Sequence, residues 1–139
     1  MSIIYDAISS AVSYLSDKSA GTFVPSIYTF TYGKPGLLPC CFNYNVNGDT
    51  VVIYGNIELN LESSPKSTTF YFSIHPDLYT KNRKITLIAN GISTAGDGII
   101  GVSRCIDDNK RIGIDLVRGD LKNIAPGTYD ISFICYYRK

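Results

Sequence analysis

The motif in this chain that most resembles a known chemical site is a glycine run, Gly96–Gly101, whose spacing matches the dinucleotide-binding pattern GxGxxG. That pattern binds pyrophosphate when its last glycines open a helix whose N-terminal amides point at the phosphates. Here the next residues, Val102–Ile106, favour a strand and soon reach a turn, so no strand–helix–strand unit surrounds the glycines. The run indicates a loop that enters a strand, and we expect no cofactor.

The single histidine, His75, limits the nucleophilic chemistry that the chain could perform. A Ser-His-Asp system would have to use it, yet the chain has no Gly-x-Ser-x-Gly elbow. A pairing of His75 with the thiol of Cys40 or Cys105 stays open, because the sequence does not place either cysteine in space. A histidine before Pro76, on the polar face of a strand end, is typical of a solvent-facing turn. We expect no catalytic residue and no enzyme.

The carboxylates and thiols of the chain give little further indication of a catalytic or metal site. Asp107 and Asp108 are adjacent, but they stand in a loop with Asn, Lys and Arg, where aspartate usually makes turn hydrogen bonds and remains ionised. A weak surface cation site stays open there. The four cysteines lack any CxxC spacing and are expected to be buried thiols that act as small apolar residues: Cys40, Cys41, Cys105 and Cys135. We therefore predict no metal site.

Tyrosine is the feature that stands out, with 11 residues against no tryptophan. Tyr54, Tyr71 and Tyr136 fall on strand faces opposite the expected core, so each would be exposed in a monomer. A tyrosine ring suits a subunit interface or the stacking of a sugar, although ordinary β propensity explains part of the count. Only 18% of residues are charged, against about 25% in an average chain. We predict a partly covered outer face, with these three tyrosines as interface or glycan contacts.

The elements that must position these residues begin with a short helix. Ile4, Ile8, Ala11 and Leu15 recur at helical spacing between Ser2 and about residue 16. A helix this short is marginal alone in water, so its apolar stripe must pack on something. It either lies on the chain's own β domain or packs against copies of itself. We assign residues 1–20 to this helix and a linker, for trimerisation or docking, and residues 21–139 to a β domain.

After residue 20 the apolar runs have period two. The clearest hairpin joins Leu38–Val46 to Thr50–Leu61 through Asn47-Gly48-Asp49, because Asn-Gly supplies the positive φ angles of a tight turn. Its second arm has one apolar face, formed by Val51, Ile53, Gly55, Ile57, Leu59 and Leu61. A strand with one polar face argues against a parallel α/β sheet.

Further alternating runs occupy residues 70–75, 84–90, 98–106, 112–116 and 129–137. Gly/Pro/Asn/Asp turns separate them, and residues 107–111 close a second hairpin. About seven or eight strands at this spacing predict an all-β fold, an antiparallel sandwich or jelly roll. The last strand is expected to be central, since an edge strand at the chain end would fray.

Composition excludes other classes of protein. The net charge is +1, so no overall field would attract nucleic acid or an anionic membrane. No run approaches the roughly 18 apolar residues of a membrane helix, and residues 1–20 lack the basic start of a signal peptide. We expect one domain, made in a cytoplasm, with no nucleic acid partner and no membrane insertion.

Five segments share a pattern of strands and turns: NGDTVVIYGNIELNL, TTFYFSIHPDLYT, KITLIANG, GIIGVSRCIDDNKRIGIDL and APGTYDISFICYYRK. Over about residues 47–137 this pattern resembles the head domains of bacteriophage fibre proteins. The resemblance implies a trimer of β sandwiches, carried on helical stalks, that attaches a virion to a host receptor or decorates a capsid. Two departures are clear: only about 20 residues precede the β domain, and the turn 75–79 lacks the Gly-Tyr-Arg usual in that family. A small head fibre, capsid-auxiliary protein or vertex spike fits better.

The leading hypothesis is a non-enzymatic virion protein, made in the host cytoplasm and assembled as a homotrimer. Ile4, Ile8, Ala11 and Leu15 would form its three-helix seam, and its partners would be other virion proteins and a host surface glycan or receptor. The alternative is a carbohydrate-binding β-sandwich module that uses exposed tyrosines. A jelly-roll enzyme such as a cupin is disfavoured, because cupin metal sites need several histidines.

Overall fold

The structure is a computed structural model that describes residues 18–28, 32–36, 41–79, 84–107 and 110–139. Its elements are β1 (Lys18–Phe23), β2 (Ile27–Tyr28), β3 (Lys34–Pro35), β4 (Phe42–Asn47), β5 (Thr50–Leu61), β6 (Ser67–Ser73), a 3-10 helix η1 (Pro76–Leu78), β7 (Ile85–Ser93), β8 (Gly98–Asp107), β9 (Arg111–Val117) and β10 (Gly127–Arg138). The all-β class is confirmed. The helix predicted near the N-terminus, with Ile4, Ile8, Ala11 and Leu15, lies outside the described residues.

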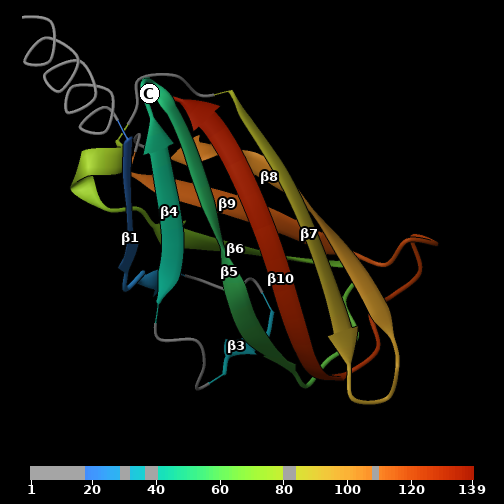
Figure 1. The fold of residues 1–139 in the computed structure, drawn as a ribbon. Helices are drawn as coiled ribbons and strands as arrows, with labels where there is room; N and C mark the ends of the chain where they lie inside the picture. The colour runs from blue at the N-terminus through green and yellow to red at the C-terminus, as the bar shows by residue number, and fades with distance from the viewer. Residues whose placement is uncertain (1–17, 29–31, 37–40, 80–83, 108–109) are drawn as a thin grey trace, which may run out of the picture.

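All ten described strands belong to one antiparallel sheet, in the order β1-β4-β5-β10-β7-β8-β9-β6-β2, with β3 paired to β5. In Figure 1, β4, β5, β10 and β7 run side by side, while β9 and β6 cross behind them. The sheet therefore curls into a half-barrel, and the two separate sheets of the expected sandwich or jelly roll are not what the described strands form.

β8 is the strand at which the sheet changes direction. It pairs with β7 at Gly98–Val102 and with β9 along its length, and its register with β9 shifts between Ser103 and Ile106. Such an irregularity bends a strand and increases its twist. One sheet can thus fold over its own core, an outcome that period-two alternation alone does not distinguish from two stacked sheets.

The predicted hairpins are confirmed. Asn47 pairs with Thr50 across the first turn, and Gly48 has a φ of 61°, a left-handed conformation that glycine adopts without steric cost. Arg111 pairs with Asp107 across the second hairpin. β10 pairs with β5 on one side and β7 on the other, so the last strand is central as predicted.

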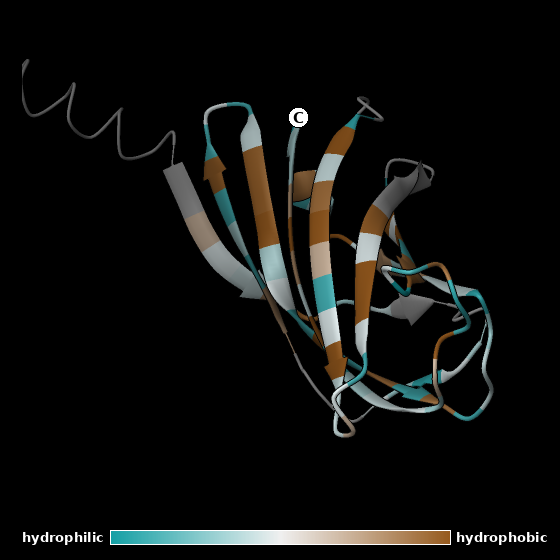
Figure 2. Ribbon diagram, turned by 90° about the vertical axis from the view of Figure 1, so that its right-hand side faces the viewer, coloured by the Kyte–Doolittle hydropathy of each residue, from teal (hydrophilic) through white to brown (hydrophobic). Residues whose placement is uncertain are grey.

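The core lies between the two halves of the curled sheet. The Phe42 and Phe133 rings of the front strands lie 4.8 Å apart between centroids, and both meet Phe72 of β6 behind them, at 5.0 and 5.2 Å. Gly55 makes room for this cluster, because a Cβ there would come within 2.6 Å of the Phe42 ring. Hydrophobic bands alternate with polar ones along the strands in Figure 2, as their period of two requires.

The sheet begins earlier than the predicted domain boundary. β1 starts at Lys18, which pairs with Asn47, so residues 18–20 belong to a strand and not to the linker assigned to them. A truncation that removes residues 1–17 keeps every described strand.

Candidate interaction surface

Four neighbouring strands carry exposed apolar side chains on the face that points away from the core. The pairing register aligns Tyr54 of β5 with Ile134 of β10, Ile134 with Ile88 of β7, and Ile88 with Val102 of β8. These four residues are 41%, 47%, 61% and 54% exposed, respectively. Side chains directly opposite each other on paired strands are in contact range, so the four form one continuous row across the sheet.

The row extends along the strands. Tyr136 lies one row further along β10, Ile100 one row in the other direction on β8, and Ile92 two rows away on β7. We call the exposed hydrophobic residues of these strands the apolar face: Tyr54, Ile88, Ile92, Ile100, Val102, Ile134 and Tyr136. The remaining described positions in the central rows hold uncharged residues: Val52, Asn56, Thr86, Asn90 and Ser132. On β5, β10 and β7, the described charged residues of this face lie beyond these rows, as with Glu58 and Asp130, while Asp115 of β9 pairs with Val102 at the border of the central row.

Contiguous apolar patches of this kind on soluble proteins generally mark interaction sites, whereas single exposed hydrophobic residues need no explanation. Three strand spacings of about 4.8 Å make the central row about 14 Å wide. Among the described residues the patch lies on regular, paired strands, so it is a rigid surface. The arrangement suits burial against another protein surface of complementary shape.

The structure places two of the three tyrosines predicted as contacts on the apolar face and the third elsewhere. Tyr54 and Tyr136 lie on the apolar face, on adjacent strands and in adjacent rows. Tyr71 lies on β6, in the other half of the curled sheet, where the Arg111 guanidinium sits 5.8 Å from its ring centroid. Its side chain is partly buried and takes part in a cation–π contact within the chain.

The aliphatic residues of the apolar face were not singled out from the sequence, although a signal for them exists. Phe133–Tyr137 is an uninterrupted apolar run within a strand. Such a run is typical of strands covered on both faces, whereas a half-buried strand alternates. Leu87 and Ala89 alternate as core residues, so the period of two likewise places Ile88, which lies between them, on the outer face.

The residues considered for catalysis have structural roles where they are described. His75 Nδ1 accepts a hydrogen bond from the Asp77 backbone N–H at 3.1 Å and so caps η1, while its ring stacks on Tyr44 at 6.4 Å. The turn position predicted for His75 is thus confirmed. The side chains of Cys40 and Cys105 lie outside the described part, so their pairing with His75 stays untested.

Cys135 is fully buried, and burial raises the pKa of its thiol to about 12. Because only the thiolate is a good nucleophile and metal ligand, this thiol is inert at neutral pH, and it packs as the small apolar residue that was predicted. Within the described ranges, no three His, Cys, Asp or Glu side chains lie close enough together to hold a metal ion. Asp108 falls outside those ranges. None of the described residues form a helix that is long and apolar enough to cross a membrane.

The glycine run ends in a strand. Gly96 has a φ of 91° in a turn, and Gly98 begins β8. No helix follows the glycines, so the backbone amides that hold pyrophosphate in dinucleotide-binding loops have no counterpart at this position.

No family model matches the chain, and no curated protein matches its sequence. Its fold does match a solved structure, avian reovirus sigmaC117-326 in the C2 crystal form, with a TM-score of 0.51 and 11% sequence identity. The match covers 86% of this chain and 61% of the sigmaC chain, so the chain spans about three fifths of the length of that neighbour. At this identity the likeness concerns the fold alone.

Proposed function

We propose that the chain is a non-enzymatic virion protein, a small trimeric fibre head that associates through the apolar face and attaches the particle to a host cell. The observation that carries this proposal is the apolar face, whose central rows hold no charged residue at the paired positions of β5, β10, β7 and β8. The fold likeness to a reovirus protein supports the viral class. The bacteriophage origin and the location on a head or capsid rest on the sequence resemblance.

The occupant of the apolar face that we favour is a second copy of this chain. A receptor-binding surface must stay exposed on the free virion, where an apolar patch of this extent would promote aggregation. A surface between subunits is covered from assembly onward. Interfaces between identical subunits are also more apolar than those of transient complexes, with charged residues depleted at their centres.

A second contact between subunits would come from the N-terminal segment. Ile4, Ile8, Ala11 and Leu15 remain the predicted helix seam, and residues 1–17 connect directly to β1 at one end of the sheet. Two independent contacts predict that removing residues 1–17 weakens the trimer without abolishing it. A truncation at residue 20 would be a poorer test, because it also removes half of β1.

The proposal is tested by the solution mass of the full chain, measured by light scattering. The wild type should show three times 15.3 kDa. Ile134→Asp places a charge at the centre of the apolar face, where it would have to be desolvated on assembly, and should reduce the mass to that of one chain. Leu121→Asp is the matched control, because Leu121 is equally apolar and more exposed but lies outside the four strands.

Circular dichroism on the same samples separates loss of assembly from loss of folding. A monomeric wild type at micromolar concentration would contradict the trimer. An Ile134→Asp protein that remains trimeric would show that the apolar face is not the interface.

A further inference from the structure

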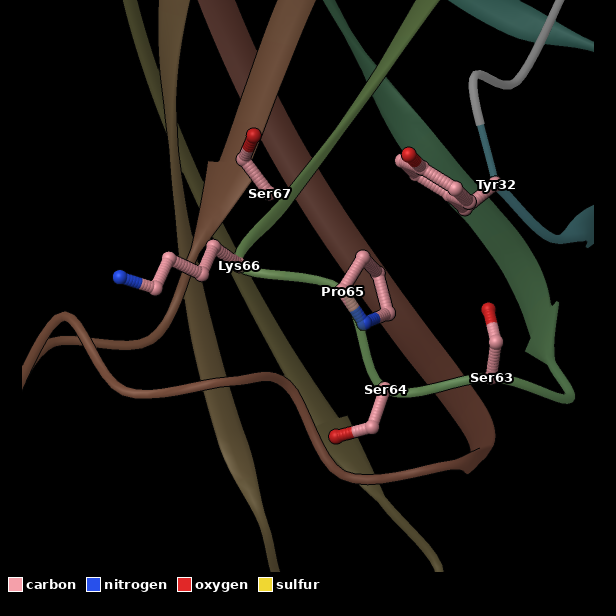
Figure 3. A pocket seen from close by; sticks show the side chains of 6 residues that line it. All are labelled: Tyr32, Ser63, Ser64, Pro65, Lys66 and Ser67. Atoms are coloured by element: carbon pink, nitrogen blue, oxygen red, sulfur yellow. The ribbon is translucent and has the colours of Figure 1, made fainter.

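A cleft of about 330 Å³ lies where the segment before β3 meets the connection from β5 to β6 (Figure 3). It is lined by Tyr32, Ser63, Ser64, Pro65, Lys66 and Ser67. We propose that this Tyr32 cleft binds a neutral saccharide unit of a host surface glycan. The proposal rests on the attachment function proposed above and supplies its ligand class and its site.

The groups that face the cleft are a tyrosine ring, a proline ring and a serine hydroxyl. In Figure 3 the Tyr32 ring lies across from Pro65, and the Ser63 hydroxyl points into the space between them. The Lys66 side chain extends away from this space, as does Ser64, whose hydroxyl donates to the Ile124 carbonyl at 2.8 Å. A tyrosine ring, a proline ring and a neutral hydroxyl match the apolar face and the hydroxyl edge of a sugar.

Other ligand classes fit this composition less well. A phosphate needs converging cationic side chains or backbone amides, yet the lysine of the lining points away. An apolar anchor from a protein partner needs a closed hydrophobic pocket, whereas three of the six lining residues are serines. A saccharide tolerates an open, hydroxylated site because most of its own surface is polar.

The cleft is held in shape from both sides by side chains that bind backbone. Thr68, which is fully buried in β6, donates its hydroxyl to the Tyr32 carbonyl at 2.8 Å and accepts from the Tyr32 N–H at 3.3 Å. On the other wall, the Ile124 N–H donates to the Pro65 carbonyl at 2.7 Å, and the Asn123 amide donates to the Ser64 carbonyl at 2.8 Å. Tyr32 is half-exposed at 50% but fixed at its backbone, so less ordering entropy opposes binding.

A second hollow of about 240 Å³ adjoins the first, since both are bordered by Ser63. Its lining adds Gly33, Lys34, Asn60 and Glu62, which provide hydrogen-bond donors and acceptors. A glycan that places one unit against Tyr32 would therefore find polar partners for the next unit.

The position of the cleft suits attachment. Lys18, at the start of β1, pairs with Asn47 beside the β4–β5 turn, whereas the cleft is lined by Ser63–Ser67, which follow Leu61 at the other end of β5. Thr50 and Leu61 are the ends of a 12-residue strand, about 36 Å apart at 3.3 Å per residue. Subunits joined through their N-terminal segments and the apolar face would leave the cleft exposed at the far end of the head.

The test is binding of the full-length wild type to an array that carries neutral and acidic oligosaccharides. Binding to a neutral oligosaccharide is expected, and Tyr32→Ala should weaken it about tenfold through the lost stacking. Tyr32→Phe keeps the ring and should remain within about twofold of wild type. Tyr79→Ala is the matched control, since Tyr79 is another exposed tyrosine outside the cleft.

Light scattering on each sample separates this proposal from the proposed assembly. A trimeric wild type that binds no neutral oligosaccharide, or binding that Tyr32→Ala leaves unchanged, overturns the site while the trimer stands. Tyr32-dependent binding by a monomeric wild type supports the site and refutes the trimer.

Discussion

The apolar face and the Tyr32 cleft differ in how the chain builds them. The face uses side chains from four regular strands, fixed by the hydrogen bonds of the sheet. The cleft uses two irregular segments: Thr68 holds the first through the Tyr32 backbone, and Ile124 holds the second through Ser64 and Pro65. The first surface is apolar and has no charged residue at the centre of its four strands, while the second is a hollow with a tyrosine ring and a serine hydroxyl.

This difference indicates which kind of contact each surface suits. An apolar surface gains free energy in proportion to the area it buries, which suits a permanent contact between subunits. A hollow with hydroxyls gains little from burial and depends on the placement of a few groups, which suits a reversible contact with a polar ligand. The two surfaces should therefore respond independently to mutation, unless the core beneath them is damaged.

The largest effect should come from Phe72→Ala, which breaks both surfaces at once. Phe72 joins the front strands to β6, and loss of a buried phenylalanine typically costs about 3–5 kcal/mol of unfolding free energy. This loss of unfolding free energy is best measured by urea denaturation of the Ile134→Asp variant with and without Phe72→Ala. The Ile134→Asp variant is expected to be monomeric, so its stability does not depend on protein concentration. A cost below about 1 kcal/mol, similar to that expected of exposed Leu121→Ala, would show that the two halves of the sheet are not joined through this cluster.

An intermediate effect is expected from Thr68→Val, which should affect the cleft alone. Without the hydroxyl, the N–H and carbonyl of Tyr32 lose their partner, at a cost of about 1–3 kcal/mol where water cannot replace it. Saccharide binding should weaken because Tyr32 is no longer held, while the solution mass stays unchanged. Thr68→Ser restores the hydroxyl and should recover binding; failure to recover would mean that packing of the Thr68 methyl group, and not its hydrogen bonds, positions Tyr32.

The smallest effects are expected from Tyr136→Ala and Tyr71→Ala, two tyrosines that the sequence analysis predicted as contacts of the same kind. Tyr136→Ala removes an aromatic side chain at the border of the apolar face and should weaken assembly by about 1 kcal/mol, roughly fivefold in the dissociation constant. Tyr71→Ala loses the contact with Arg111 within the chain, and should lower stability by about 0.5–1 kcal/mol without changing assembly. Light scattering at several concentrations measures the change in assembly of each variant, and thermal unfolding measures the change in its stability. Equal effects on assembly would place β6 in the interface as well.

Much of the fold follows from local signals. Val51, Ile53 and Leu59 are buried on one face of β5 because a period of two fixes which side chains share a face. The Asn47-Gly48 turn fixes the register of β4 against β5 for an equally local reason. The sequence could not show that one sheet curls over its own core, since alternation is the same in either architecture. That outcome depends on the irregular pairing of β8 with β9.

The candidate sites show the same division. The sequence by itself determined that Tyr54 and Tyr136 point away from the core, and the apolar run Phe133–Tyr137 carried the signal that both faces of β10 hold apolar side chains. Only the tertiary structure decided that Ile88 and Ile134 become neighbours, that Tyr71 belongs to the other half of the sheet, and that Tyr32 meets the loop of Ser63. The reason is physical: the period of a strand specifies which face a side chain occupies, while its neighbours on that face depend on pairings between residues far apart in the chain.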